Sequence, residues 1–188
     1  MTFGSWMPLD VPGQTRALHL LTQAARQANC RAIIQSQSAS ECGFTSDEQI
    51  LYIATAPHQM VFPHCSAVVH HGGAGTTHAA TLAGKPSIVI ANISEQEHWG
   101  SELRRLGIAS KAAKRRTVSA GGIARRIRQV IASSDMTTKA AAIAGAMRKE
   151  RGVEQSVGLI MQRFAGLIHS ERETGECSLP RKMSSHGS

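Results

Sequence analysis

A glycine-rich segment constrains the fold of this chain more than any other feature. Residues 68–85 read VVHHGGAGTTHAATLAGK. The apolar start is typical of a buried strand, and the glycines are typical of a tight turn. The Thr and Ala residues that follow predict a helix over about 75–83. A strand that turns directly into a helix is the unit from which parallel α/β sheets are built.

The rest of the chain repeats this alternation of short apolar runs and helical patterns. Strands are predicted at 1–4, 31–35, 50–55, 67–70, 87–91 and 108–111. Helices are predicted from Pro12 to about 28 and at 97–106, 119–133, 137–151 and 153–169, with Asp135 as a candidate cap and a short turn or helix at 57–63. Because apolar strands alternate with helices, we expect an α/β fold: a Rossmann-like parallel sheet with helices on both faces.

Length and composition indicate a globular domain. The chain has 188 residues, of which 41% are hydrophobic, and 17 glycines, so disordered, collagen-like and disulfide-scaffold classes are excluded. No apolar run approaches the ~20 residues of a membrane helix. Four cysteines without CxxC spacing and a start without signal-peptide features predict a cytoplasmic protein. We expect one domain over residues 1–170 and a disordered tail over 171–188, which lacks a periodic apolar pattern.

The positive charge is concentrated in one segment. Residues 104–151 hold 13 basic and two acidic side chains, while residues 1–103 carry a net charge of −3. A basic segment can bind nucleic acid, an acidic membrane surface or an anionic substrate, or it can form the solvated faces of helices. Apolar residues interleave at helical spacing, which favours solvated faces. Nucleic acid is not expected as a partner, and the segment has no assigned role.

The glycine-rich turn is a candidate phosphate site. At the carboxyl end of a strand, the start of the next helix offers free amides, and Thr76 or Thr77 adds a hydroxyl. A tight turn without a ligand is the alternative. GxGxxG is absent, and a P-loop fails because the residue five before Gly84 is Ala79. His70 and His71 are adjacent in a strand and point to opposite faces, so we expect no shared metal.

Residues 56–100, APHQMVFPHCSAVVHHGGAGTTHAATLAGKPSIVIANISEQEHWG, together with FGS at 3–5, resemble the nucleotide-sugar-binding signature of family 1 glycosyltransferases. The similarity is to the branch of sterol 3-beta-glucosyltransferases and of macrolide and antibiotic glycosyltransferases, and it extends to about residue 168. The resemblance implies the C-terminal, donor-binding domain of a two-domain GT-B fold. It also implies that the N-terminal acceptor-binding domain, and with it the catalytic base, lies outside this sequence, so we assign no catalytic residue.

The resemblance also implies which residues bind the donor diphosphate. Gly4 and Ser5 would form the turn after the first strand and face the diphosphate or the cleft. His71 would bond a donor phosphate through a ring nitrogen. The amides and the hydroxyl of the helix start would come from Gly73, Ala74, Gly75 and Thr76.

The nucleobase and the sugar have their own implied partners. Ala56, Pro57 and His58 would lie beside the nucleobase. Glu95 and Gln96, on a loop after a strand, would bond sugar hydroxyls, although family members commonly have Asp in place of Glu95. UDP-glucose is the implied donor substrate, and no metal or other cofactor is needed.

The implied reaction is the inverting transfer of a hexose to a hydroxyl of a lipophilic acceptor such as a sterol or macrolide. Without an acceptor domain we expect little or no transfer by this chain alone. The alternatives are an inactive remnant of a donor domain, an interaction module, or a donor-binding subunit that needs a separate acceptor-binding chain. Apolar residues of 153–169 predict self-association through exposed interdomain surface.

Overall fold

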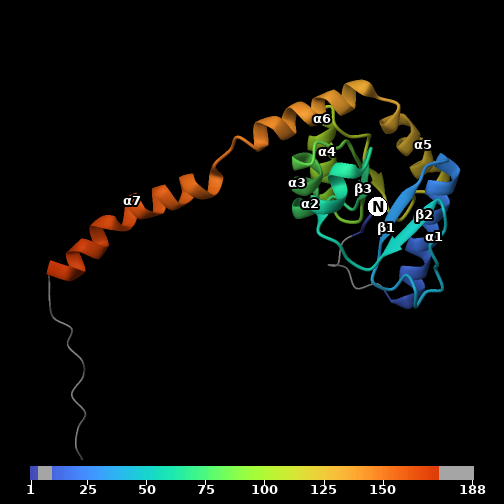
Figure 1. The fold of residues 1–188 in the computed structure, drawn as a ribbon, viewed down its shortest axis with the longest axis horizontal. Helices are drawn as coiled ribbons and strands as arrows, with labels where there is room; N and C mark the ends of the chain where they lie inside the picture. The colour runs from blue at the N-terminus through green and yellow to red at the C-terminus, as the bar shows by residue number, and fades with distance from the viewer. Residues whose placement is uncertain (4–9, 174–188) are drawn as a thin grey trace, which may run out of the picture. The chain divides into compact units, whose positions relative to one another are not determined.

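The computed structural model describes residues 1–3 and 10–173 of the chain (Figure 1). Two units are distinguished, Met1–Lys149 and Glu150–Ser188. Each is described by itself. The first unit contains the sheet and every predicted site residue that the structure describes.

The first unit is built on a parallel sheet. Strands β1 (Ala32–Gln35) and β2 (Ile50–Ile53) pair in parallel, as do β3 (Val68–His70), β4 (Ser87–Ala91) and β5 (Ala113–Lys114). Thr2 forms parallel bridges to both Gln35 and His70, so the N-terminal residues join β1 to β3. The spatial order is therefore β2, β1, residues 1–3, β3, β4, β5, the doubly wound Rossmann order. This confirms the predicted fold class.

Helices cover the sheet. Figure 1 shows α1 and α5 together beside β1 and β2, with α2, α3 and α4 gathered beside β3. Their bounds are α1 Val11–Ala28, α2 His58–Val61, α3 Ala74–Leu82, α4 Ser94–Arg105, α5 Ala120–Ile131 and α6 Ser134–Met147, and a 3-10 turn spans Phe62–His64.

The strands and helices enclose a core of aliphatic side chains. In α1, Leu18, Leu21, Ala24, Ala25 and Ala28 are buried with the β-strand isoleucines and with α5. All five residues of β4 are buried, as a strand covered on both faces requires.

The starts of two helices differ from the sequence predictions. Helix α4 begins at Ser94 rather than near residue 97, because the chain turns directly after Ile93 without a capping side chain. Helix α6 is capped by Ser133, whose Oγ accepts a hydrogen bond from the amide of Met136 at 3.2 Å. Asp135 is therefore not the cap; it lies in the first turn and pairs with Lys139.

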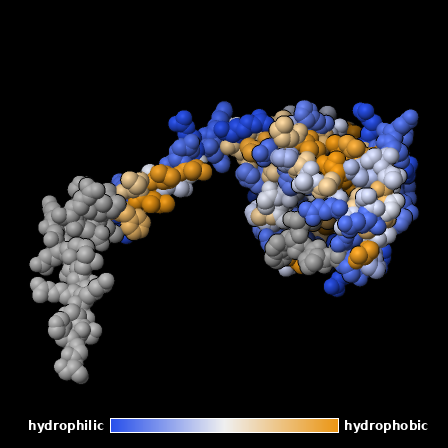
Figure 2. All heavy atoms as spheres, turned by 60° about the horizontal axis from the view of Figure 1, so that its bottom comes forward, coloured by the Kyte–Doolittle hydropathy of each residue, from blue (hydrophilic) through white to orange (hydrophobic). Residues whose placement is uncertain are grey.

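The second unit contains α7 (Gly152–Glu173). On this helix, exposed apolar side chains are visible as orange spheres in Figure 2, and they include Val153, Val157, Ile160 and Phe164. Self-association remains a prediction. Among the described residues, no helix has the length and apolar character needed to cross a membrane. Residues 174–188 of the predicted tail lie outside the described residues.

Candidate functional site

An open cleft with a volume of about 820 Å³ lies at the carboxyl ends of the strands. Its walls come from residues that follow β1, β2, β3 and β4, together with Thr2, Phe3 and the first turns of α1. Residues 1–3 and β3 are neighbours in the sheet, and the strand order reverses between them, since β1 and β2 follow on one side and β4 and β5 on the other. This switch point is where open α/β sheets bind ligands.

The structure brings the predicted site residues together in this cleft. Ten of the twelve line it: Ala56, Pro57, His58, His71, Gly73, Ala74, Gly75, Thr76, Glu95 and Gln96. The other two, Gly4 and Ser5, lie outside the described residues.

The N-terminus of α3 opens into the cleft. Gly73 is the N-cap, and no side chain caps this end of the helix. The first intrahelical bond runs from the amide of Thr77 to the carbonyl of Gly73 at 2.9 Å. By helix geometry the amides of Ala74, Gly75 and Thr76 precede that bond and have no partner within the helix. Together with the positive end of the helix dipole, they suit an anion.

The ring of His71 lies directly against Gly73. A Cβ atom added at Gly73 would come within 2.3 Å of His71 Nε2, so a glycine is required for this approach. The other ring nitrogen, Nδ1, is buried and has no hydrogen-bond partner among the described residues. Burial, and then the proximity of His58, lower the pKa of His71, while Glu95 acts in the opposite direction. The ring is therefore neutral at pH 7 and carries one N–H donor.

Gly72 holds α4 against this turn. Its φ of +90° lies in the left-handed region, and an added Cβ would meet the carbonyl oxygen of Gln96 and Cγ1 of Val89, each at 2.8 Å. The close approach carries the first turn of α4 to the mouth of the cleft. Glu95 and Gln96 thus lie in a helical turn, not on the loop that the sequence predicted.

Gln96 and Glu95 offer different chemistry to the cleft. Gln96 is 4% exposed, and its Oε1 accepts a hydrogen bond from the amide of Asn92 at 2.8 Å. The side-chain carbonyl of Gln96 therefore stabilises the turn after β4. The NH2 group of the same side chain is left as the donor to the cleft. Glu95 is exposed, and its carboxylate faces the cleft as an acceptor.

His58 forms the wall of the cleft at the start of α2. Its ring stacks on Phe62 with centroids 4.5 Å apart and an interplanar angle of 11°. Pro57 precedes it as the helix N-cap. Burial is the main cause that lowers the pKa of His58, so this wall is uncharged at pH 7.

Several residues of the cleft were missed by sequence reasoning. The Ser- and Gln-rich segment after β1 contributes Ser36, Gln37 and Ser38, and Thr55 follows β2. Gln14 of α1 also lines the cleft. The usable signal was topological: residues just after each strand of a parallel sheet meet at one edge.

Two polar side chains near the turn face the interior instead. His70 is fully buried, and its Nδ1 accepts a hydrogen bond from the amide of Gly72 at 3.1 Å, while burial lowers its pKa to about 3. Thr76 and Thr77 are both buried, and of these two candidate threonines only Thr76 lines the cleft. No group of three metal-ligating side chains gathers within the described part of the chain.

The profile of the erythromycin biosynthesis protein CIII-like C-terminal domain matches residues 11–157. The chain belongs to this family of glycosyltransferase C-terminal domains.

Curated relatives agree with this assignment. The chain is 30% identical over 160 residues to O-mycaminosyltylonolide 6-deoxyallosyltransferase of Streptomyces fradiae, covering 85% of this chain and 36% of that protein. It is 29% identical over 157 residues to a sterol 3-beta-glucosyltransferase of Arabidopsis thaliana, covering 82% of this chain and 25% of that protein. The chain thus spans about a third or less of the length of the curated relatives it matches.

Solved structures share the fold. Glycosyltransferase VinC in complex with dTDP superposes with a TM-score of 0.69 at 20% identity, over 86% of this chain and 40% of that one. LpCGTa in complex with UDP gives a TM-score of 0.68 at 16% identity, over 87% and 41% of the two chains. The fold is that of one half of GT-B glycosyltransferases, as the sequence predicted.

Proposed function

We propose that the cleft binds a nucleoside diphosphate sugar, with UDP-glucose as the first candidate, for the inverting transfer of a hexose to a hydroxyl of a lipophilic acceptor. The observation that carries this proposal is the uncapped N-terminus of α3 beside the His71 ring at the switch point of the sheet. Two solved structures with this fold are complexes with dTDP and with UDP, which supports the ligand class.

The diphosphate would lie at the start of α3. The amides of Ala74, Gly75 and Thr76 and the N–H of His71 would donate to its oxygens. These donors stabilise the negative charge that grows on the leaving diphosphate as the bond to the sugar breaks. They are fixed by the fold before the ligand binds, so little reorganisation opposes binding.

The ends of the donor would meet different walls. The nucleobase would lie beside Pro57 and the stacked ring of His58, where an uncharged surface suits a flat heterocycle. The sugar hydroxyls would donate to the Glu95 carboxylate and accept from the NH2 group of Gln96.

Calorimetric titration with UDP, UDP-glucose and dTDP-glucose tests the proposal. We expect saturable binding that weakens about tenfold or more in His71→Ala, because a hydrogen bond to a charged group contributes about 1.5–3 kcal/mol. His78→Ala is the matched control: it removes an exposed histidine of α3 that does not line the cleft. Failure of all three nucleotides to bind, or equal weakening in both variants, would overturn the proposal.

We further propose that the chain binds its donor without transferring the sugar. A general base contributes roughly 10²–10⁴-fold to such a reaction, and acceptor positioning contributes more, whereas the chain spans only a fraction of its relatives. Full activity would then need an acceptor-binding half, covalent or supplied by a partner chain. An inactive donor-domain remnant and an interaction module are the competing proposals, and loss of nucleotide binding would favour them.

A further inference from the structure

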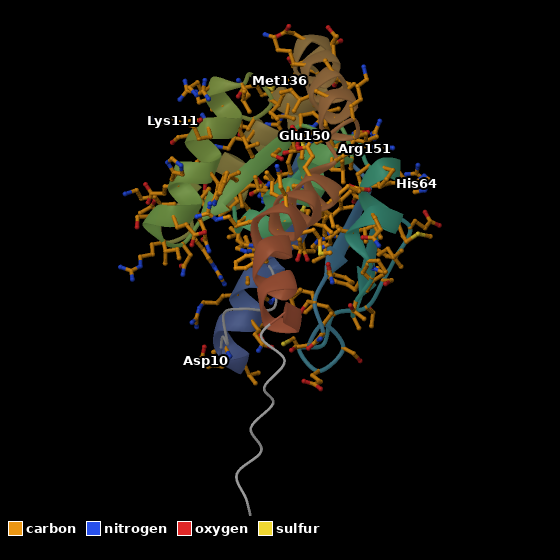
Figure 3. The ribbon with its side chains drawn as sticks, turned by 90° about the vertical axis from the view of Figure 1, so that its left-hand side faces the viewer. Asp10, His64, Lys111, Met136, Glu150 and Arg151 are labelled. Carbon is orange, nitrogen blue, oxygen red and sulfur yellow. The ribbon has the colours of Figure 1, made fainter. Side chains whose placement is uncertain are left out.

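A second hollow, with a volume of about 590 Å³, lies at the edge of the sheet and is called here the basic groove. Its walls are the segment between α4 and β5, the exposed side of α5 and the first turn of α6. None of its residues lines the cleft. In Figure 3, Lys111 and Met136 of the groove lie at one end of the unit, away from Asp10 at the start of α1.

Four cationic side chains from three segments line the basic groove: Arg104, Lys111, Arg125 and Arg126. None of the four forms an ion pair in the described part of the chain. The carboxylate of the groove is Asp135, and it is paired with Lys139 Nζ at 2.7 Å. The groove thus gathers positive charge that the protein itself leaves uncompensated.

Arg126 is held in place within this groove. Its Nε donates to the carbonyl of Lys111 at 3.1 Å, and its Nη1 donates to the carbonyl of Gly122 at 2.9 Å. Both bonds use backbone acceptors, so they fix the guanidinium without neutralising it. A cation whose position is set in advance loses less conformational entropy when it binds an anion.

Ser110 supplies a polar group that the fold does not satisfy. The residue lines the groove, is 3% exposed, and its Oγ has no hydrogen-bond partner among the described residues. A buried hydroxyl without a partner is unfavourable and needs an explanation. The Oγ atom is itself shielded from solvent, so the cations, and not this hydroxyl, would contact a ligand in the groove.

We propose that the basic groove is a second ligand site that binds a small anion with several phosphate charges, at the level of a di- or triphosphate. Four cationic side chains around one groove suit phosphate oxygens. A concave volume of this size suits a small molecule better than a membrane surface or an extended polymer. The site would use four of the 13 basic side chains of residues 104–151, none of which lines the cleft.

Calorimetric titration with inorganic tripolyphosphate, combined with amide NMR, tests the site. The groove variant is Arg104→Gln, Lys111→Gln, Arg125→Gln, three changes at exposed positions whose side chains form no hydrogen bond with the described residues. The control is Arg16→Gln, Arg31→Gln, Lys149→Gln, which removes the same charge from exposed positions outside the groove. His71→Ala serves in parallel to remove the contribution of the cleft.

We expect the groove variant to bind at least tenfold more weakly and the control to stay within about threefold. In His71→Ala, tripolyphosphate should still shift the amide signals of Gly107 and Ser110. The proposal is overturned if the control weakens as much as the groove variant, or if His71→Ala abolishes all binding. It is also overturned if a DNA or RNA oligonucleotide displaces tripolyphosphate from the groove, since nucleic acid would then be the ligand class.

Discussion

At the scale of single residues, Gly73 and His71 act as one unit, because the ring occupies the space that a side chain at Gly73 would need. In Gly73→Ala the ring must move, and we expect UDP-glucose affinity to fall about tenfold. The free energy of unfolding should change by only about 1 kcal/mol, since alanine is a modestly worse N-cap than glycine. Calorimetry and urea denaturation measure the two effects. Gly145→Ala, at a helical position with open space, is the control.

The ionisation of His71 gives a second prediction at this scale. Burial lowers its pKa in the free protein, and a bound diphosphate would raise it, so binding takes up a proton. UDP-glucose affinity should therefore increase severalfold as pH falls from 7.5 to 5.5, a range in which the diphosphate diester does not titrate. Calorimetry of His71→Gln should show a flat profile. A flat profile in the unaltered protein would contradict a phosphate contact by this ring.

The sequence predicted many of the residues that line the cleft, but it did not predict which of their polar atoms are already bonded within the protein. The motif gave the positions of His71, Glu95 and Gln96. It did not reveal that the side-chain carbonyl of Gln96 already accepts a hydrogen bond from the amide of Asn92, because that bond depends on how tightly the chain turns after β4. It also missed Gln14, which reaches the cleft only through the packing of α1.

At the scale of elements, the contact between Gly72 and α4 sets the position of the first turn of that helix. Gly72→Ala introduces both a strained φ and a clash with the backbone carbonyl of Gln96. We therefore expect a loss of roughly 2–4 kcal/mol in the free energy of unfolding. Gly43→Ala is the matched control, since its φ is +78° with nothing within 4 Å of an added Cβ. Its expected loss is about 1–2 kcal/mol. Equal losses in urea denaturation would show that the contact with α4 is not the cause.

Element types followed from the periodicity of apolar residues, whereas some boundaries did not. The start of α1 carries Asp10 and Pro12, both recognisable signals, and its position was predicted well. The start of α4 has Ile93 as its N-cap, which gives no such signal. The final strand was expected at 108–111, but regular pairing is found at Ala113–Lys114, and the earlier stretch contributes one bridge, Ser87 to Ala109.

At the scale of the whole molecule, the buried ring of His70 couples folding to pH. It lies in β3, a strand buried along its whole length at the centre of the sheet. Burial lowers its pKa to about 3, while an unfolded chain binds the proton near pH 6.5. The stabilisation from the neutral ring is thus complete above about pH 6.5 and is lost as pH falls toward 3.

We therefore expect the free energy of unfolding to decrease by up to about 1.4 kcal/mol per pH unit below pH 6. His58 and His71, whose pKa values are also lowered, add to the upper part of this range. Urea denaturation between pH 7 and 4 measures the slope. In His70→Gln the protein should be less stable at pH 7 but show a shallower slope, whereas His98→Gln, at an exposed site, should follow the unaltered protein. Should the glutamine variant fail to fold, NMR of the His70 ring in the unaltered protein decides the question, because a ring that protonates above pH 5 in the folded state would contradict the coupling.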